Sequence, residues 1–167
     1  PYNGGHGQAI RLGYEMAQKE WVFQIDSDNQ FEIQDFWKLY ALKDTYPLLL
    51  GLRKKRDDYL ERLALTKFIR FFNYLFFGVW ISDANCAFRL IRNDFIKKLL
   101  PLLDKQLVAP NIAISLLAKK KNLLQEIPIA YRRENVTHKL TEHWELIKMT
   151  FKGFIQLIKF KKIYSKF

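Results

Sequence analysis

A short apolar run from Trp21 to Ile25 constrains the fold of this chain more than any other segment. The run is rich in residues that favour β-strands, as is typical of a strand that is buried on both faces. It ends abruptly at the polar segment Asp26–Gln30. Because open α/β sheets bind ligands beyond the carboxyl ends of their strands, we expect this segment to lie at a ligand-binding edge of a sheet.

The polar segment has the ligand chemistry of a divalent metal site. Carboxylate and amide oxygens are hard donors that suit Mg²⁺ or Mn²⁺ beside a phosphate. We therefore predict that Asp26, Asp28 and Gln30 hold a metal ion against a diphosphate. In the alternative interpretation, Asp28 or Asn29 only caps a helix that begins near Ile33, and short motifs of this kind often occur by chance.

Strand-like and helix-like segments alternate along the chain. We expect helices near residues 10–19, 33–43, 59–77, 93–103 and 109–121, and strands near residues 21–25, 47–52, 88–91 and 123–129. This alternation predicts an α/β fold with a mainly parallel sheet. Since the second strand ends at Arg53, we expect Arg53 at the same sheet edge as Asp26 and Asp28.

Length and composition limit the possible classes of protein. At 167 residues the chain is long enough for one core and short for two domains. Hydrophobic residues make up 49% and aromatic residues 16%, which argues against intrinsic disorder. The net charge of +11 indicates an anionic partner. The charge alone does not distinguish nucleic acid, an acidic membrane and a phosphorylated substrate. The single cysteine, Cys86, excludes an internal disulfide and suits a reducing compartment.

The last part of the chain, residues 140–167, is expected to form a basic amphipathic helix. Apolar residues recur there at helical spacing on one face, and Lys148, Lys152 and Lys159 follow a neighbouring stripe. Such a helix suits a membrane interface, where each lysine near anionic lipid contributes about 1 kcal/mol. A helix packed on the core with a solvated lysine edge is the alternative, and the pattern fits both.

Several motifs, in the same order along the chain, resemble family 2 glycosyltransferases, the nucleotide-sugar enzymes of the GT-A fold. The pattern Asp26-x-Asp28-x-Gln30 is similar to the Asp-x-Asp region of the branch that transfers a sugar to polyprenyl (dolichyl-type) phosphate. The other segments that resemble this branch are residues 3–9, 51–53, 62–66, 82–90 and 109–111.

The resemblance implies a grip on the acceptor phosphate. The segment Gly51-x-Arg53 followed by Arg62-x-x-x-Thr66 looks like the place where two arginines and a hydroxyl hold a lipid phosphate. Arg62 and Thr66 are four residues apart and so share one helix face, and arginine suits phosphate because of its fixed fork of donors. The pair is equally typical of a solvated helix face. Asp83 is either a residue of the cleft or a turn-stabilising side chain.

The resemblance further implies an open mixed α/β sheet flanked by helices, with the first strands of the family missing. Residues 1–139 would be a partial glycosyltransferase catalytic domain, and residues 140–167 a separate C-terminal helix. Without those strands, an apolar sheet edge near Val22–Ile25 would stay unpaired, so we expect the isolated chain to be poorly soluble and inactive.

The implied reaction is metal-dependent, inverting transfer of a sugar from a nucleotide-diphosphate sugar to a polyprenyl phosphate, by an enzyme that lies at the inner, cytoplasmic face of a membrane. The residues assigned to this reaction are Asp28, Arg53, Arg62 and Asp83 for catalysis, Asp26, Arg53, Arg62 and Thr66 for substrate binding, and Asp26, Asp28 and Gln30 for Mg²⁺ or Mn²⁺.

Two rivals remain. A transferase of the same fold could act on a sugar or lipid hydroxyl, with Asp83 as the base. A basic nucleic-acid-binding module without catalysis would explain the charge. It leaves the acidic motif unexplained, so nucleic acid is the less expected partner.

Overall fold

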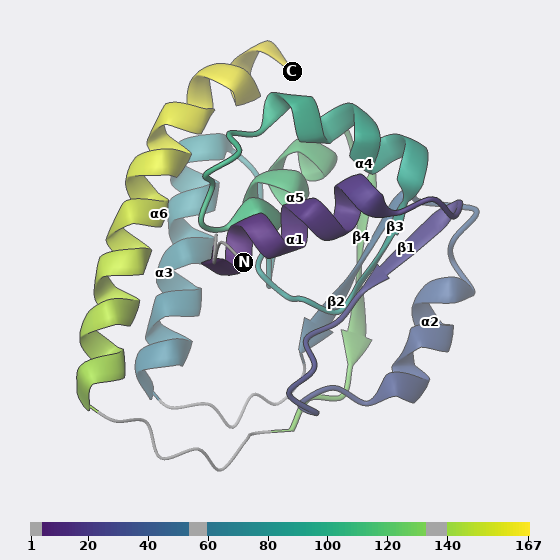
Figure 1. Cartoon of the computed structure of the whole chain (residues 1–167), viewed down its shortest axis with the longest axis horizontal. Coiled ribbons are helices and arrows are strands. Elements are labelled where there is room, and N and C mark those ends of the chain that lie inside the picture. The colour runs from purple at the N-terminus through teal and green to yellow at the C-terminus, as the bar shows by residue number, and fades with distance from the viewer. Residues whose placement is uncertain (1–4, 54–59, 133–139) are drawn as a thin grey trace.

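The computed structural model describes residues 5–53, 60–132 and 140–167 (Figure 1). Its strands are β1 (Trp21–Gln24), β2 (Leu48–Arg53), β3 (Arg89–Arg92) and β4 (Leu124–Ile129). Its helices are α1 (Gly5–Met16), α2 (Phe36–Tyr40), α3 (Leu60–Phe77), α4 (Asn93–Leu99), α5 (Pro110–Lys120) and α6 (Leu140–Lys166), with 3₁₀ turns at Ile33–Asp35 and Leu100–Leu102. None of these helices is both long and apolar enough to cross a membrane.

The four strands form one mixed sheet in the order β1-β3-β2-β4. β3 pairs antiparallel with both β1 and β2, whereas β2 and β4 are parallel. β1, β2 and β4 therefore run in one direction, and their carboxyl ends share an edge with the amino end of β3. The open mixed sheet implied by the family resemblance is confirmed. The mainly parallel sheet implied by the alternation is wrong, because the chain returns through α3 and a loop before it enters β3 from that shared edge.

Helices cover both sides of this sheet. Figure 1 shows α2 on one side, and α1, α4 and α5 on the other. α3 and α6 lie side by side beyond α5, where the ring of Phe154 packs edge-on against the rings of Phe68 and Phe72. α6 also turns Leu157, Phe160 and Tyr164 into the core.

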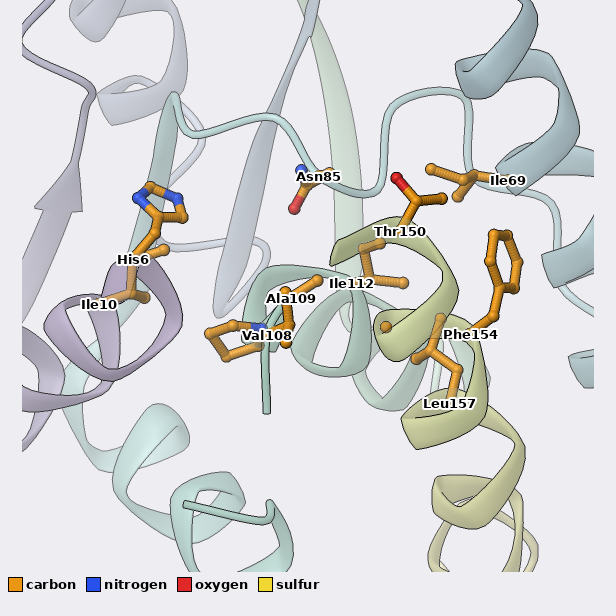
Figure 2. Close-up of a pocket in the computed structure, with 12 residues that line it drawn as sticks. His6, Ile10, Ile69, Asn85, Val108, Ala109, Ile112, Thr150, Phe154 and Leu157 are labelled. Carbon is orange, nitrogen blue, oxygen red and sulfur yellow. The ribbon is translucent and has the colours of Figure 1, made fainter. Parts of the chain in front are cut away.

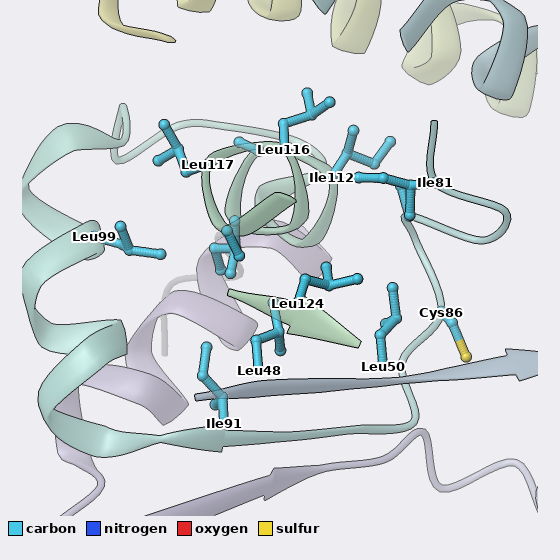
Figure 3. Close-up of a cluster of buried hydrophobic side chains, with 14 of the residues drawn as sticks. Leu48, Leu50, Ile81, Cys86, Ile91, Leu99, Ile112, Leu116, Leu117 and Leu124 are labelled. Carbon is cyan, nitrogen blue, oxygen red and sulfur yellow. The ribbon is translucent and has the colours of Figure 1, made fainter. Parts of the chain in front are cut away.

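The core lies between the sheet and helices α4 and α5. Leu48, Leu49 and Leu50 of β2 are fully buried. Figure 3 shows how side chains from the strands meet those of the helices. The labelled members of this cluster are Leu48, Leu50, Ile81, Cys86, Ile91, Leu99, Ile112, Leu116, Leu117 and Leu124.

β1 is less buried than its sequence predicts. All four of its residues are only half-buried, because β1 lies at an edge of the sheet and, within the described ranges, pairs with β3 alone. The expected helix at residues 33–43 is also shorter, since it consists of a 3₁₀ turn followed by the short α2. The expected helix at residues 93–103 ends at Leu99 and continues as a 3₁₀ turn that contains Pro101.

Gly51 permits a close backbone approach at the centre of the sheet. Its N–H donates to the carbonyl oxygen of Phe88 at 2.8 Å. A Cβ added at Gly51 would lie 2.9 Å from that oxygen and 2.5 Å from Cδ1 of Ile129. β2 can therefore hold this register only with glycine at position 51.

We expect Gly51→Ala to lower the free energy of unfolding by about 1–3 kcal/mol, because the added methyl group forces a backbone shift. Gly13→Ala is the matched control. It lies in α1 where an added Cβ meets no atom within 4 Å, and it should raise the stability by about 0.4–1 kcal/mol. Urea unfolding of both variants measures the difference, and equal effects would contradict the packing described for β2.

Candidate functional site

An ion pair joins the end of β2 to the loop before β3. Nε and Nη2 of Arg53 donate to the two carboxylate oxygens of Asp83, at 2.5 and 2.8 Å. Asp83 is buried and Arg53 nearly so. Burial alone would lower the pKa of Arg53, but the hydrogen bonds and charge of Asp83 outweigh it and raise that pKa. The pair holds one cation and one carboxylate at the shared sheet edge.

The acidic loop lies at the same edge. Asp26 is half-buried, and burial raises the pKa of its carboxyl group. The charges of His6, Arg53 and Arg89 partly oppose this rise in pKa, whereas the charge of Asp28 adds to it. The structure therefore brings Asp26, Asp28 and Arg53 together, as the parallel course of β1 and β2 predicts.

The acidic loop does not cap a helix. The 3₁₀ turn that follows has Glu32 at its N-cap, and α2 has Asp35, neither with a side-chain capping bond. Instead, Oδ1 of Asp28 accepts the N–H of Gln30 at 3.2 Å, and Asn29 has a φ of 59°. The alternative interpretation of Asp28 and Asn29 as helix caps is wrong. The side chain of Asp28 is exposed in a turn of its own.

Tyr131, directly after β4, links the acidic loop to the ion pair. Its hydroxyl donates to Oε1 of Gln30 at 3.0 Å, and its backbone bridges to Phe31. The guanidinium carbon of Arg53 lies 5.0 Å from the centre of its ring, which is the geometry of a cation–π contact. Tyr131 is thus a positioning residue that the sequence patterns did not reveal.

Glu126 of β4 fixes the other member of the ion pair. Oε1 of Glu126 accepts the N–H groups of Ser82 and Asp83, at 2.7 and 3.2 Å. A carboxylate inside a mainly apolar strand could have indicated this role in the sequence. β4 and the residues that follow it therefore support the ion pair, through Glu126 and Tyr131.

A fully buried arginine holds the loop between Ala84 and Phe88 in place. The guanidinium of Arg89 donates to the carbonyl oxygens of Ala84, Cys86 and Asn111, and burial lowers its pKa. Nearby, the hydroxyl of Tyr14 donates to Oε1 of Gln24 at 2.6 Å, and burial raises the pKa of Tyr14 to about 12.

The proposed acceptor grip is only partly visible. Arg62 and Thr66 both lie in α3, on one face by their spacing. The side chain of Thr66 is half-buried, whereas the side chain of Arg62 lies outside the described part of the structure. The relation of Arg62 to Arg53 therefore stays a prediction.

The oxygen donors of the acidic loop fit a metal site that water and substrate complete, rather than one formed by protein ligands alone. Across residues 5–53, 60–132 and 140–167, no group of three or more histidine, cysteine, aspartate or glutamate residues could hold a metal ion. Asp26 and Asp28 supply two carboxylates. Mg²⁺ in nucleotide sites typically takes one or two carboxylates and completes its shell with water and substrate phosphates. The two residues fit that requirement, with Gln30 as an oxygen donor nearby.

A cavity of about 190 Å³ opens beside this edge (Figure 2). It lies between the starts of α1 and α5, the loop before β3, and helices α3 and α6. The start of α1 packs closely here, since a Cβ at Gly7 would lie 2.2 Å from the carbonyl oxygen of Leu107. This close packing gives a structural reason for a glycine in the segment at residues 3–9.

No protein-family model matches the chain. Three curated proteins are similar in sequence. Dolichyl-phosphate β-glucosyltransferase of Dictyostelium discoideum is 26% identical over 143 residues, and undecaprenyl-phosphate 4-deoxy-4-formamido-L-arabinose transferase of Aeromonas hydrophila is 28% identical over 114 residues. An uncharacterised protein of Methanocaldococcus jannaschii is 27% identical over 138 residues. These matches cover 77%, 68% and 76% of this chain, and 42%, 35% and 57% of the relatives, respectively.

Solved structures share the fold. Glucosyl-3-phosphoglycerate synthase of Mycobacterium tuberculosis superposes with a TM-score of 0.69 in its UDP complex, at 14% identity, over 97% of this chain and 57% of that enzyme. Another complex of the same synthase, with Mn²⁺, UDP-glucose and glycerol 3-phosphate, gives a TM-score of 0.67 at 15% identity. This chain therefore has the GT-A fold and spans about half the length of the proteins it matches.

The raised pKa of Asp26 leads to a pH-dependent prediction. The folded state binds the proton of Asp26 more tightly than the unfolded state does. The stabilisation from this protonation is therefore full at low pH, and it is lost as the pH rises through the pKa of Asp26 in the folded state. Ionised Asp26 thus costs stability at neutral pH, and Asp26→Asn should raise the melting temperature at pH 7 more than at pH 3.

The expected rise is below about 4 °C, the shift that 1 kcal/mol produces in a protein of this size. Thermal unfolding at both pH values measures it, and Asp44→Asn, at an exposed carboxylate, controls for the change in net charge. A melting temperature that Asp26→Asn leaves unchanged or lowers at pH 7 would contradict the electrostatics described for the loop.

Proposed function

We propose that this chain transfers a sugar from a nucleotide-diphosphate sugar to a polyprenyl phosphate with inversion. Its named relatives are a dolichyl-phosphate and an undecaprenyl-phosphate sugar transferase, and its fold is GT-A. The observation that carries the proposal is the meeting of the acidic loop and Arg53 at one sheet edge. Opposite charges at one sheet edge suit a reaction between two phosphate-bearing substrates.

The acidic loop would bind the donor. Asp26 and Asp28, with Gln30 directly or through water, would hold Mg²⁺ or Mn²⁺ against the donor diphosphate. Bound there, the cation would neutralise charge on the departing nucleotide diphosphate. Mn²⁺ is the first metal to test, because a structure with the same fold contains it together with UDP-glucose.

Two arginines and a threonine would bind the acceptor. Arg53, Arg62 and Thr66 would orient the acceptor phosphate for in-line attack on the anomeric carbon. A bond then forms between a phosphate oxygen and that carbon, while the bond from the carbon to the donor diphosphate breaks. Since a phosphate monoester is already anionic near neutral pH, the reaction needs no general base.

The ion pair favours a phosphate over a hydroxyl acceptor. A hydroxyl would need a base, for which Asp83 is the candidate. Both carboxylate oxygens of Asp83 accept hydrogen bonds from Arg53, so the carboxylate is already engaged by the guanidinium. Asp83 would instead position the guanidinium of Arg53.

Transfer assays on the full-length protein, with a nucleotide sugar, Mn²⁺ and farnesyl phosphate, test the assignment. Asp28→Ala and Arg62→Ala should each lower kcat/KM by about 100-fold or more, because each removes a charge that acts on the transition state. Asp44→Ala and Arg92→Ala are matched controls, since both residues are exposed and Arg92 ends β3 at the opposite sheet edge.

Unchanged kcat/KM in both test variants would refute the assignment. Activity on a hydroxyl acceptor that Asp83→Asn abolishes, with none on farnesyl phosphate, would favour the alternative acceptor.

The proposed site of action is the cytoplasmic face of an anionic membrane, where such an acceptor would be found. Helices α3 and α6 each expose large apolar side chains and lysines, which together are called the α3–α6 patch. The apolar members are Phe68, Phe71, Tyr74, Leu75, Phe151, Ile155 and Ile158, and the lysines are Lys67, Lys148, Lys152 and Lys159. This combination suits the interface of an anionic leaflet.

We expect the chain to bind vesicles that contain phosphatidylserine, and the pair Phe71→Ser with Leu75→Ser to weaken this binding by about tenfold or more, since two apolar side chains leave the lipid. Leu12→Ser with Met16→Ser is the matched control, because these residues are equally exposed at the same spacing on α1. Cosedimentation measures the binding. Equal losses in both pairs would show that the α3–α6 patch has no special role.

A further inference from the structure

The cavity beside the sheet edge is mainly apolar. Its polar side chains are those of His6, Asn85 and Thr150. The remaining walls come from aliphatic and aromatic groups, chiefly at the start of α5 and on α6, among them Ile112 and Phe154 (Figure 2).

The cavity adjoins the proposed site. His6, at the start of α1, and Asn85, in the loop before β3, line the same cavity (Figure 2). Asn85 follows Asp83, the partner of Arg53, by two residues. A molecule whose charged end lies among these residues could therefore place an adjoining apolar group in the cavity.

Size and lining favour a hydrocarbon over a sugar. A cavity of about 150 Å³ lined by leucine, isoleucine and phenylalanine binds benzene, so about 190 Å³ has room for a branched five-carbon unit. A sugar would bring several hydroxyl groups, and most of them would lie against apolar walls without hydrogen-bond partners.

We propose that this cavity binds the isoprenyl unit next to the phosphate of the lipid acceptor. The inference rests on the proposed function and extends it, because it assigns the apolar part of the acceptor to α5 and α6 rather than to the membrane alone. The acceptor phosphate then lies at the sheet edge, and the isoprenyl unit next to it lies in the cavity.

Gly153 of α6 offers a clean test. It lines the cavity, and a Cβ added there meets no atom within 4 Å. Because a Cβ is accepted there, Gly153→Leu should add its side chain to the cavity wall and reduce the free space, and the loss of a helical glycine favours folding. Gly13→Leu is the matched control, because Gly13 is also a helical glycine with open space but lies on an exposed part of α1.

The experiment measures by calorimetry how tightly the full chain binds inorganic phosphate, isopentenyl phosphate and farnesyl phosphate. We expect the unmodified protein and Gly13→Leu to bind isopentenyl phosphate about tenfold or more tightly than inorganic phosphate, because several buried carbons contribute. In Gly153→Leu that preference should fall to about twofold or less, while the affinity for inorganic phosphate stays unchanged.

Because this experiment measures binding and not sugar transfer, it tests the cavity assignment independently of the proposed reaction. If Gly153→Leu keeps the preference for isopentenyl phosphate while the protein transfers sugar to farnesyl phosphate, the cavity assignment is overturned and the proposed function stands. If the cavity preference is found but no transfer to any lipid phosphate occurs, the cavity assignment stands and the reaction is wrong. A dimer of the unmodified chain that Gly153→Leu abolishes would assign the cavity to a second copy and overturn the proposal.

Discussion

The bidentate ion pair between Arg53 and Asp83 is the interaction on which the site depends. It ties the carboxyl end of β2 to the loop before β3 in a largely buried position, where an unpaired guanidinium would be costly. Arginine stays protonated at any physiological pH, so its burial requires the negative charge of a carboxylate partner. Glu126 and Tyr131 of the neighbouring β4 segment then fix the pair from two sides, and Tyr131 extends the connection to the acidic loop.

Local sequence patterns predicted the elements that carry the site. The apolar runs before Asp26 and before Arg53 are strands, and the resemblance to polyprenyl-phosphate sugar transferases agrees with both the sequence relatives and the fold. These predictions succeeded because each strand is a short run of residues that favour β-structure and ends at polar residues. The proximity of Asp26 to Arg53 followed from the common direction of β1 and β2 alone.

Local sequence patterns did not predict the contacts between segments that lie far apart in the chain. The antiparallel entry of β3 depends on the return path of the chain through α3, and the half-burial of β1 depends on its edge position. Arg89 begins β3 and Glu126 lies within β4, and a charged residue at such a position signals a buried polar contact but not its partner. Likewise, the helix-cap interpretation of Asp28 failed because a turn within the loop uses its carboxylate instead.

The helices outside the sheet give the site a second, apolar half. α6 packs on α3 and α5 through one face, lines the cavity with Phe154 and Leu157, and exposes Phe151 and Ile155 on another face. The same helix thus borders both the cavity proposed for the first isoprenyl unit and the patch proposed for the membrane. A lipid acceptor that passes from membrane to sheet edge would contact it throughout.

The central claim is that the acidic loop holds a divalent cation against a diphosphate. Electron paramagnetic resonance of Mn²⁺, titrated with the chain in the presence of inorganic pyrophosphate, tests this without requiring turnover. The account predicts that the chain binds Mn²⁺ together with pyrophosphate, and that Asp26→Asn and Asp28→Asn each weaken this binding by about tenfold or more, about 1.4 kcal/mol. Equal Mn²⁺ affinity in the unmodified chain and both variants would contradict it.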